Sequence, residues 1–482
     1  MANFFLSIEG LYVDLSGSPV LQDVHFAIRH KEQWAILGPS GCGKTVLAHT
    51  LAGRHVYRGQ IFSSFESIES FQKKVLVVEQ QHRFKSLNNQ SEFYYQQRYN
   101  SYDASGTISV AEDLAAFREY VAGIFHPEEL IDLFQIRNLL SEPLIQLSNG
   151  ENKRLQIVKA LLTDHVLLIL DQPFTGLDPE GRKQLSDILN RLSDMGEQLM
   201  LITSVRDIPS CITHMAEMER GKLIRRGKPQ DLLLTGSVAY ALLPPKKFPS
   251  LITFPYPDYG YAVRMIDVNI RYEEKSILTG IYWEVKKGSC WSLSGANGAG
   301  KSTLLSLITG DNPQAYANEI YLFDRRRGTG ESIWEIKQKT GFLSPELHLY
   351  FDLAATAYSA LASGLWDTIG LFRKLSEEQH ELVLEWLDFL DLKDYRNRLL
   401  SSLPAGLQRM VLLGRAMIRM PPLLVLDEPG QGLDPDHIER VKNLIDRYCE
   451  KYTATLIYVS HYSEETPACV DQYLRLQKGH IV

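Results

Sequence analysis

The stretch GPSGCGKT, from Gly38 to Thr45, has a second version, GANGAGKS, from Gly295 to Ser302. Both fit the pattern G-x-x-x-x-G-K-[S/T], in which backbone N–H groups and the start of a helix hold phosphate while the lysine reaches the β- and γ-oxygens. Each copy follows a β-rich apolar stretch and precedes a helical pattern. A plain glycine turn does not require this context, so we interpret both copies as phosphate-binding loops.

The residues downstream of each loop repeat in step with it. Lys44 and Lys301 are 257 residues apart (301 − 44), and Asp171 and Asp427, at the ends of two apolar strands, are 256 apart (427 − 171). A repeat held in register over this length indicates a duplicated domain and not a short-period solenoid.

The duplication predicts two domains, residues 3–227 and 261–482, joined by a linker over residues 228–260. Prolines in that linker favour an extended connector over a long helix. In each domain a strand, the loop, a helix and a further strand follow one another, and the strands are almost continuously apolar. This order is typical of a parallel sheet covered on both faces, so the predicted class is α/β with two tandem P-loop domains.

Charge, cysteine content and hydropathy exclude several classes of function. The formal net charge is −7, which gives no electrostatic footprint for nucleic acid, and we interpret the run Arg325–Arg327 as a solvated loop. The five cysteines are scattered and form no C-x-x-C pair, which argues against disulfides and a zinc site. No stretch approaches the ~18–20 apolar residues of a membrane helix. We expect a cytoplasmic protein, at most peripheral at the inner face of a membrane through a partner.

The motifs together resemble the ATP-binding-cassette (ABC) ATPases over essentially the whole chain. In that family the glycine loop, a Q-loop, an LSGGQ signature, an acidic strand end and a switch histidine follow in this order, and the corresponding positions occur twice here in the same order. The signature positions read LSNGE at 147–151 and LPAGL at 403–407. The resemblance implies that each cassette adds an antiparallel β subdomain and a helical subdomain to its parallel sheet. It also implies an intramolecular sandwich, with ATP held between the loop of one cassette and the signature of the other.

The resemblance also implies a role for individual residues. Glu428 would orient or deprotonate the attacking water, and His461 would contact the γ-phosphate. Magnesium would be held by Thr45 and Asp171 in one site and by Ser302 and Asp427 in the other. The implied ATP contacts are Gly38, Pro39, Ser40, Gly41, Cys42, Gly43, Lys44 and Thr45, then Gly295, Ala296, Asn297, Gly298, Ala299, Gly300, Lys301 and Ser302, and finally Tyr272 (stacked on adenine), Ser148, Gly150, Asp178 and Asp434.

The first loop lacks groups that the second has. Gln172 follows its strand-end aspartate, Ser204 occupies the histidine position and Leu15 the adenine-stacking position. Its partner signature would be LPAGL, in which Pro404 offers no hydroxyl. In a head-to-tail sandwich all four departures fall on one composite site, so we expect one hydrolytic site and one kept mainly for binding. The second site departs once, with Glu346 where a Q-loop glutamine is expected.

Some single residues have an ordinary interpretation. Cys42 is interpreted as a small filler of the first loop, and His82, His348 and His437 as surface or capping residues. Gln80 and Gln81 are the candidate Q-loop residues of the first half. The tyrosine-rich stretch 91–106 that follows them could pack on its own helical region, dock a partner or stack on nucleic acid.

Three roles are compatible with these motifs. The chain as a whole resembles the tandem cassettes named for molybdenum transport or photorepair, which favours an ATPase that docks on separate membrane-spanning subunits. The alternative is an ATPase switch that acts on DNA or on a repair or regulatory protein. A ribosome-associated tandem cassette is the weakest, because here the linker is rich in proline and tyrosine and one signature is lost. No residue identifies molybdate or any other substrate.

Overall fold

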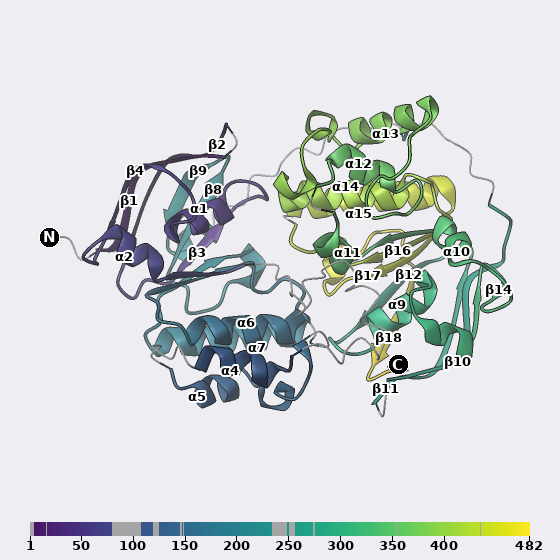
Figure 1. The fold of residues 1–482 in the computed structure, drawn as a ribbon, viewed down its shortest axis with the longest axis horizontal. Helices are drawn as coiled ribbons and strands as arrows, with labels where there is room; N and C mark the ends of the chain where they lie inside the picture. The colour runs from purple at the N-terminus through teal and green to yellow at the C-terminus, as the bar shows by residue number, and fades with distance from the viewer. Residues whose placement is uncertain are drawn as a thin grey trace. The chain divides into compact units, whose positions relative to one another are not determined.

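The computed structural model describes residues 4–15, 17–79, 108–118, 125–144, 147, 149–233, 248–249, 256–272, 275–352, 354–433 and 435–482. These residues divide into two compact units, coloured purple to teal and teal-green to yellow in Figure 1. Unit 1 holds the described residues up to 233, and unit 2 holds those from 248 onward.

Unit 1 is built on a six-stranded sheet in the order β5-β6-β7-β3-β8-β9. All neighbours are parallel except β8 and β9. The strands are β3 (Trp34–Leu37), β5 (Val75–Val78), β6 (Leu167–Asp171), β7 (Leu199–Ile202), β8 (His214–Glu219) and β9 (Lys222–Gly227). A separate antiparallel sheet in the order β2-β1-β4 contains β1 (Phe4–Leu15), β2 (Ser18–Arg29) and β4 (Arg58–Ser63).

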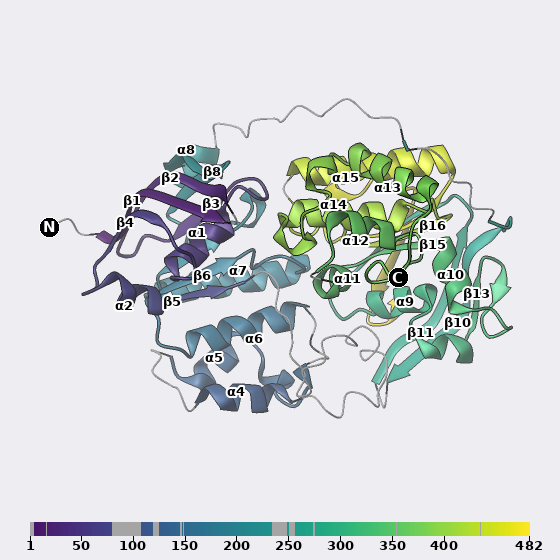
Figure 2. The ribbon, with the colours of Figure 1, turned by 45° about the horizontal axis from the view of Figure 1, so that its top comes forward.

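Helices cover the parallel sheet of unit 1. They are α1 (Lys44–Leu51), α2 (Ile68–Lys73), α4 (Val110–Arg118), α5 (Pro127–Leu133), α6 (Asn149–Leu161), α7 (Pro179–Asp194) and α8 (Pro229–Leu233), with short 3₁₀ turns at Arg137–Leu139 and Val205–Asp207. Figure 2 shows α4, α5 and α6 on one side of the strands β5 and β6, and the sheet β1, β2 and β4 on the other.

Unit 2 repeats this plan. Its main sheet has the order β15-β16-β17-β12-β18-β19, and its antiparallel sheet the order β11-β10-β13-β14. The strands are β10 (Tyr261–Tyr272), β11 (Lys275–Lys286), β12 (Cys290–Gly295), β13 (Glu319–Leu322), β14 (Arg325–Arg326), β15 (Thr340–Leu343), β16 (Leu423–Asp427), β17 (Thr455–Val459), β18 (Gln472–Gln477) and β19 (His480–Ile481). In the main sheet β18 and β19 are antiparallel and the other neighbours parallel.

The helices of unit 2 follow the same order along the chain as those of unit 1. They are α9 (Lys301–Thr309), α10 (Ile333–Lys339), α11 (Pro345–Tyr350), α12 (Ala357–Ser363), α13 (Glu377–Phe389), α14 (Ala405–Met417) and α15 (Pro435–Tyr452), with 3₁₀ turns at Pro313–Ala317, Lys393–Tyr395, Leu400–Ser402 and Ser463–Glu465. In Figure 1 α12 to α15 lie on one side of β16 and β17, and α9 with β10 and β11 on the other.

The apolar strands explain why both faces of each main sheet are covered. Successive residues of a strand point to opposite faces. In β6, Leu168 and Leu170 pack with the helices α4 to α7, whereas Leu167 and Ile169 pack with α1 and the antiparallel sheet. All five residues of β6 are buried. The strand β16 divides its residues between two core clusters in the same way.

The predicted α/β class and the two subdomains of each cassette are confirmed. The predicted strand ends at Asp171 and Asp427 are the ends of β6 and β16, and the helices that follow the two loops begin at Lys44 and Lys301. Strand β9 ends at Gly227 and β10 begins at Tyr261. The domain limits 3–227 and 261–482 remain predictions, and the expected linker includes the short helix α8.

Candidate functional site: two phosphate-binding loops and a carboxylate network

Both glycine loops have the same backbone at the point where the helix starts. Gly43 and Gly300 have φ angles of 106° and 103°, in the left-handed region. A Cβ atom at either position would lie 2.7 Å from a Cδ2 atom, of Leu21 in unit 1 and Leu278 in unit 2. Only glycine meets both conditions without strain. The two loops are therefore built alike, as their sequences predicted.

The loop lysines also have equivalent positions. The ammonium group of Lys44 donates to the carbonyl oxygens of Gly38 and Pro39, at 2.7 and 2.8 Å. That of Lys301 donates to the carbonyl oxygens of Gly295 and Ala296, at 2.6 and 3.0 Å. Each lysine thus places its charge over its own loop, where the loop N–H groups of this motif bind phosphate.

Side-chain oxygen atoms that could hold a cation lie beside each loop. In unit 1 the Thr45 hydroxyl donates to Asp171 Oδ2 at 2.6 Å, and burial raises the pKa of Asp171. In unit 2 Ser302 lies in the first turn of α9 and Asp427 ends β16. Burial, together with repulsion from Glu428, raises the pKa of Asp427. A hydroxyl and a carboxylate are hard oxygen donors of the kind that Mg²⁺ prefers, so these residues fit that cation.

Glu428 is held from three directions. Its backbone has a φ of 47°, and its N–H donates to Val459 O at 2.9 Å. Its Oε1 atom lies 2.9 Å from His461 Nε2, and its Oε2 accepts a 2.7 Å hydrogen bond from the side-chain amide of Gln431. Burial raises the pKa of Glu428, but contact with His461 and the charges of Lys301 and Arg409 outweigh it, so this pKa lies below its usual value.

Arg409 extends this network into the helical subdomain. It lies on α14, is only 2% exposed, and donates through Nη2 to Gln431 Oε1 at 3.1 Å and through Nη1 to Ser344 O at 3.3 Å. Burial lowers the pKa of its guanidinium to about 10. The contacts run from His461 through Glu428 and Gln431 to Arg409. The sequence analysis missed Gln431 and Arg409, although both have repeat counterparts, Thr175 and Lys153, that differ from them.

The same strand end in unit 1 carries other groups. Gln172 adopts the backbone of Glu428, with a φ of 48° and an N–H that donates to Ile202 O at 2.8 Å. At the histidine position, the Ser204 hydroxyl donates to Asp207 Oδ2 at 3.0 Å. Lys153 donates to the carbonyl oxygen of Glu79 at 2.6 Å. Unit 1 therefore keeps the geometry of the strand end with an amide in place of the carboxylate.

The residues expected at the signatures are described only in part. Ser148 and Asp434 lie outside the described residues, as do Gln80, Gln81, His82 and the stretch 91–106. Gly150 lies in the first turn of α6. Asp178 is the N-cap of α7, and its Oδ1 accepts from Gly181 N at 2.7 Å. Pro404 is the N-cap of α14 and makes no side-chain capping hydrogen bond.

Three further predicted positions are located within single units. Tyr272 ends β10 and is half-buried, and its hydroxyl accepts a 3.0 Å hydrogen bond from Asn312 Nδ2. Leu15 ends β1 and packs against the unit 1 core. Glu346 lies in the first turn of α11. Adenine stacking on Tyr272 remains a prediction.

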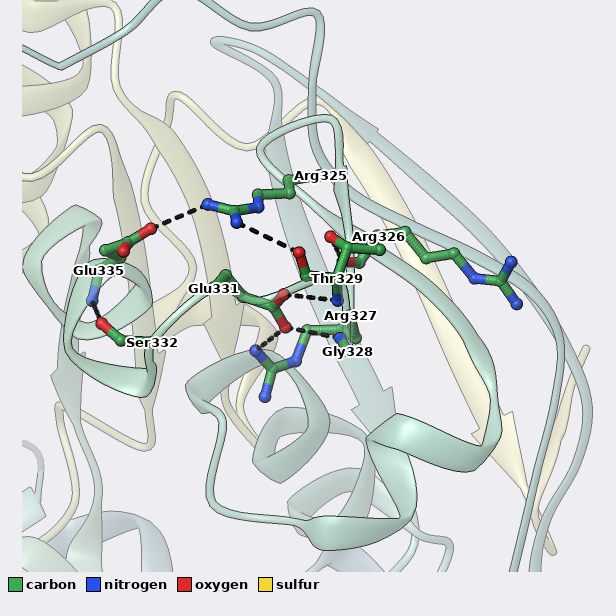
Figure 3. A network of polar contacts seen from close by, with 8 residues as sticks. All are labelled: Arg325, Arg326, Arg327, Gly328, Thr329, Glu331, Ser332 and Glu335. Atoms are coloured by element: carbon green, nitrogen blue, oxygen red, sulfur yellow. Dashed lines mark hydrogen bonds and ion pairs between the residues drawn. The ribbon is translucent and has the colours of Figure 1, made fainter.

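Two basic side chains are buried, which contradicts a surface position for His348 (interpreted as a surface or capping residue) and a solvated position for Arg327. His348 is 8% exposed, and its Nε2 lies 2.7 Å from Gln408 Oε1 on α14, because α11 packs against that helix. Arg327 is 3% exposed and forms a 2.8 Å ion pair with Glu331, as Figure 3 shows.

The other two arginines of the run Arg325–Arg327 are exposed, and they differ in their contacts. Arg325 forms a 3.1 Å ion pair with Glu335, whereas Arg326 points away from the acidic side chains of Figure 3. The expectation of a solvated run is therefore confirmed for Arg325 and Arg326 and is wrong for Arg327. Cys42, by contrast, is a buried filler as predicted: it packs in the unit 1 core, and burial raises the pKa of its thiol.

None of the helices within the described ranges is both long and apolar enough to cross a bilayer.

Comparison with known proteins identifies the family. The family model described as "ABC transporter" matches residues 21–175 and 278–431. The chain is 33% identical to the ABC transporter ATP-binding protein ModF of Escherichia coli (strain K12), over 95% of this chain and 94% of that protein. It is 32% identical to an uncharacterized ABC transporter ATP-binding protein of Schizosaccharomyces pombe, over 100% of this chain and 99% of that protein.

Solved structures show the same fold. An archaeal ribosome recycling factor, solved in complex with a ribosomal stalk protein, matches with a TM-score of 0.57 at 18% identity, over 98% of this chain and 89% of that chain. An RNase-L inhibitor matches with a TM-score of 0.55, also at 18% identity, over 98% of this chain and 89% of that chain. These likenesses support the tandem arrangement of two cassettes. With both loops and the two matched segments, the chain belongs to the ABC transporter family and is a tandem ABC ATPase.

Proposed function

We propose that this ATPase hydrolyses ATP chiefly at the loop of unit 2, with Glu428 as the base for the attacking water and His461 at the γ-phosphate. The observation that carries the proposal is the placement of Glu428: its carboxylate lies 2.9 Å from His461 Nε2 and accepts a 2.7 Å hydrogen bond from Gln431, contacts that favour its charged form. A carboxylate in that state can accept a proton or orient water, whereas the amide of Gln172 at the equivalent place in unit 1 cannot accept one.

The loop of unit 1 is proposed to bind nucleotide without efficient turnover. It keeps Lys44, Thr45 and Asp171, which supply the charge and oxygen ligands for a magnesium-bound phosphate. Gln172 and Ser204 replace the two hydrolytic groups. This combination favours a binding site that contributes to conformational change and little to turnover.

Magnesium is the cation that we propose for both sites. Thr45 and Asp171 would hold it in unit 1, and Ser302 and Asp427 in unit 2. When bound with ATP, the ion would neutralise charge on the transferring phosphoryl group. Lys301 would bind the β- and γ-phosphate oxygens directly, and Glu428 and His461 would act on water and on the γ-phosphate.

We also propose that ATP closes the two cassettes head to tail, as the ABC resemblance implies. Ser148 and Gly150 would then complete the loop of unit 2, with Asp178 approaching across the interface. Asp434 would approach the loop of unit 1, and the LPAGL signature of unit 2 would complete that site. In this arrangement the replacements at Gln172, Ser204, Leu15 and Pro404 all fall on one composite site, which is the reason for expecting only one hydrolytic centre.

The work done by this cycle is proposed to be transport, through a separate membrane-spanning partner on which the ATPase docks. The name of the Escherichia coli relative, an ABC transporter ATP-binding protein, supports this role. The alternative is a switch that acts on DNA or on a repair or regulatory protein. No sequence motif identifies a substrate, so the partner would have to identify it.

The experiment uses Glu428→Gln, which should retain ATP and stay closed. The variant is captured from solubilised cells in the presence of ATP and magnesium, with Lys301→Ala as a control that should bind ATP poorly at this site. Recovery of a multi-span membrane protein with Glu428→Gln and not with Lys301→Ala would support transport. Recovery of DNA or of proteins that fractionate away from membranes would favour the alternative, and would leave the proposed hydrolytic site unaffected.

A further inference from the structure

Three of the five cysteines meet in unit 2, although their spacing in the sequence argued against a metal site. Cys290 begins β12, Cys449 lies in α15, and Cys469 lies in the loop before β18. Their Sγ atoms all lie within 4.8 Å of one another. The intervals of 159 residues (449 − 290) and 20 residues (469 − 449) conceal this grouping, because a strand, a helix and a loop bring the three together.

The surroundings of the cluster suit a bound ion better than an exposed thiol pair. Cys290 and Cys449 are each 6% exposed, and Cys469 is half-buried, which leaves one side for entry. The cluster lies at the start of β12, whereas the phosphate-binding loop follows the other end of that strand. It is therefore separate from the ATP site.

The corresponding corner of unit 1 is held together differently. Cys211 is the counterpart of Cys469: its N–H donates to Asn190 Oδ1 at 2.8 Å, just as the N–H of Cys469 donates to Asp446 Oδ1 at 2.8 Å. The other two positions are Gln33 (290 − 257) and Ser193 (449 − 256).

Gln33 stabilises that corner through two side-chain hydrogen bonds. Its side chain donates to Glu197 O and accepts from Leu199 N, both at 2.7 Å. Unit 1 thus closes this corner with hydrogen bonds, so the same fold in unit 2 does not require a thiol cluster there.

We propose that Cys290, Cys449 and Cys469 form a three-thiolate site for a soft, thiophilic cation, with Cu(I) as the preferred ion. Thiolates select Cu(I), zinc and iron–sulfur clusters over hard cations. Structural zinc takes four tetrahedral ligands, and the group found among the described residues offers three. Cu(I) is satisfied by two or three sulfur ligands. On binding, each coordinating thiol gives up its proton, so binding releases protons and tightens as the pH rises.

The experiment is a titration of the reduced whole chain with Cu(I), without oxygen and in competition with a chromogenic Cu(I) chelator. Native mass spectrometry counts the bound ions. Wild type should take one Cu(I) from the chelator, and Cys469→Ser should weaken that binding by about tenfold or more, since even loss of a partner that only orients a metal ligand costs 10–100-fold. Cys211→Ser, which changes the counterpart in unit 1, should leave the affinity unchanged.

Two controls keep the result interpretable. Cys469 is half-buried, so its serine variant should fold, and Cys469→Ala repeats the test with a side chain that cannot bind metal at all. The ATPase rate of each variant reports whether unit 2 is intact, because none of the three cysteines belongs to the proposed hydrolytic machinery.

Three outcomes would overturn the proposal. The first is equal Cu(I) affinity in wild type, Cys469→Ser and Cys469→Ala. The second is tighter binding of Zn²⁺ than of Cu(I) at the same thiols. The third is a wild-type chain that binds no Cu(I) when reduced but loses two thiols to a disulfide with peroxide, which would make the cluster a redox pair.

Discussion

The hydrogen bond from Gln431 to Glu428 predicts a loss of turnover when the amide is removed. Gln431→Met keeps the length of the side chain, but takes the 2.7 Å donor from Glu428 and the 3.1 Å acceptor from Arg409. A hydrogen bond to a charged group contributes about 1.5–3 kcal/mol. If it is used to position Glu428 in the transition state, kcat should fall by about 10- to 150-fold, at 1.36 kcal/mol per factor of ten.

The assay is steady-state ATPase activity at saturating ATP and magnesium, with kcat and KM measured separately. The KM should change little, because Lys301 and its loop are untouched. The matched control is Thr175→Val at the repeat counterpart (431 − 256), where kcat should stay within about twofold. The melting temperature is measured for both variants. Gln431→Met leaves the buried Arg409 without its Gln431 acceptor, which should destabilise unit 2.

A kcat within twofold of wild type for Gln431→Met would refute the reasoning, since the amide would then not position Glu428. An equal fall in Gln431→Met and Thr175→Val would also refute it, because both strand ends would then contribute to turnover. If kcat falls only because the variant is partly unfolded, the fall should disappear when the assay is repeated well below the melting temperature.

The remaining predictions concern binding and stability. Lys44→Ala should weaken nucleotide binding to unit 1, measured with a fluorescent ATP analogue, and should lower turnover only through impaired closure; loss of turnover with binding intact would contradict this. Thr45→Val should make nucleotide binding to unit 1 less dependent on magnesium, and an unchanged dependence would argue against the metal assignment. Burial opposes the charged form of His165, but its 2.9 Å contact with Glu197 raises its pKa above the usual value. The stabilisation of the folded state by this contact is therefore complete below about pH 6.5, and it is lost as the pH rises through the pKa of His165 in the folded state. Chemical denaturation of His165→Gln should show a stability deficit at pH 5.5 that shrinks by pH 8, and a constant deficit would contradict the pair.

The fold was predictable from the sequence because its signals are local or repeated. The loops, the helices that follow them and the strand ends at Asp171 and Asp427 are contiguous motifs, and the register of 256 to 257 residues links the copies. The α/β class and the two subdomains followed from these motifs and from the ABC resemblance.

The support of the site was not predictable in the same way. Arg409 reaches Gln431 across 22 residues, and the cysteine cluster joins a strand, a helix and a loop. Such contacts depend on how α14 and α15 pack, which no short pattern encodes. The signal that could have revealed them is the difference between copies, with Thr175 and Lys153 in unit 1 where unit 2 has Gln431 and Arg409.

The central claim is that one of the two loops carries the hydrolysis. It is tested most directly by measuring the ATPase rate of Glu428→Gln and of Gln172→Glu beside wild type, with ATP binding measured in each. We predict that Glu428→Gln abolishes turnover while still binding ATP, and that Gln172→Glu changes the rate by less than about twofold because Ser204 and Pro404 still limit the other site. Substantial turnover in Glu428→Gln, or a doubled rate in Gln172→Glu, would contradict the account.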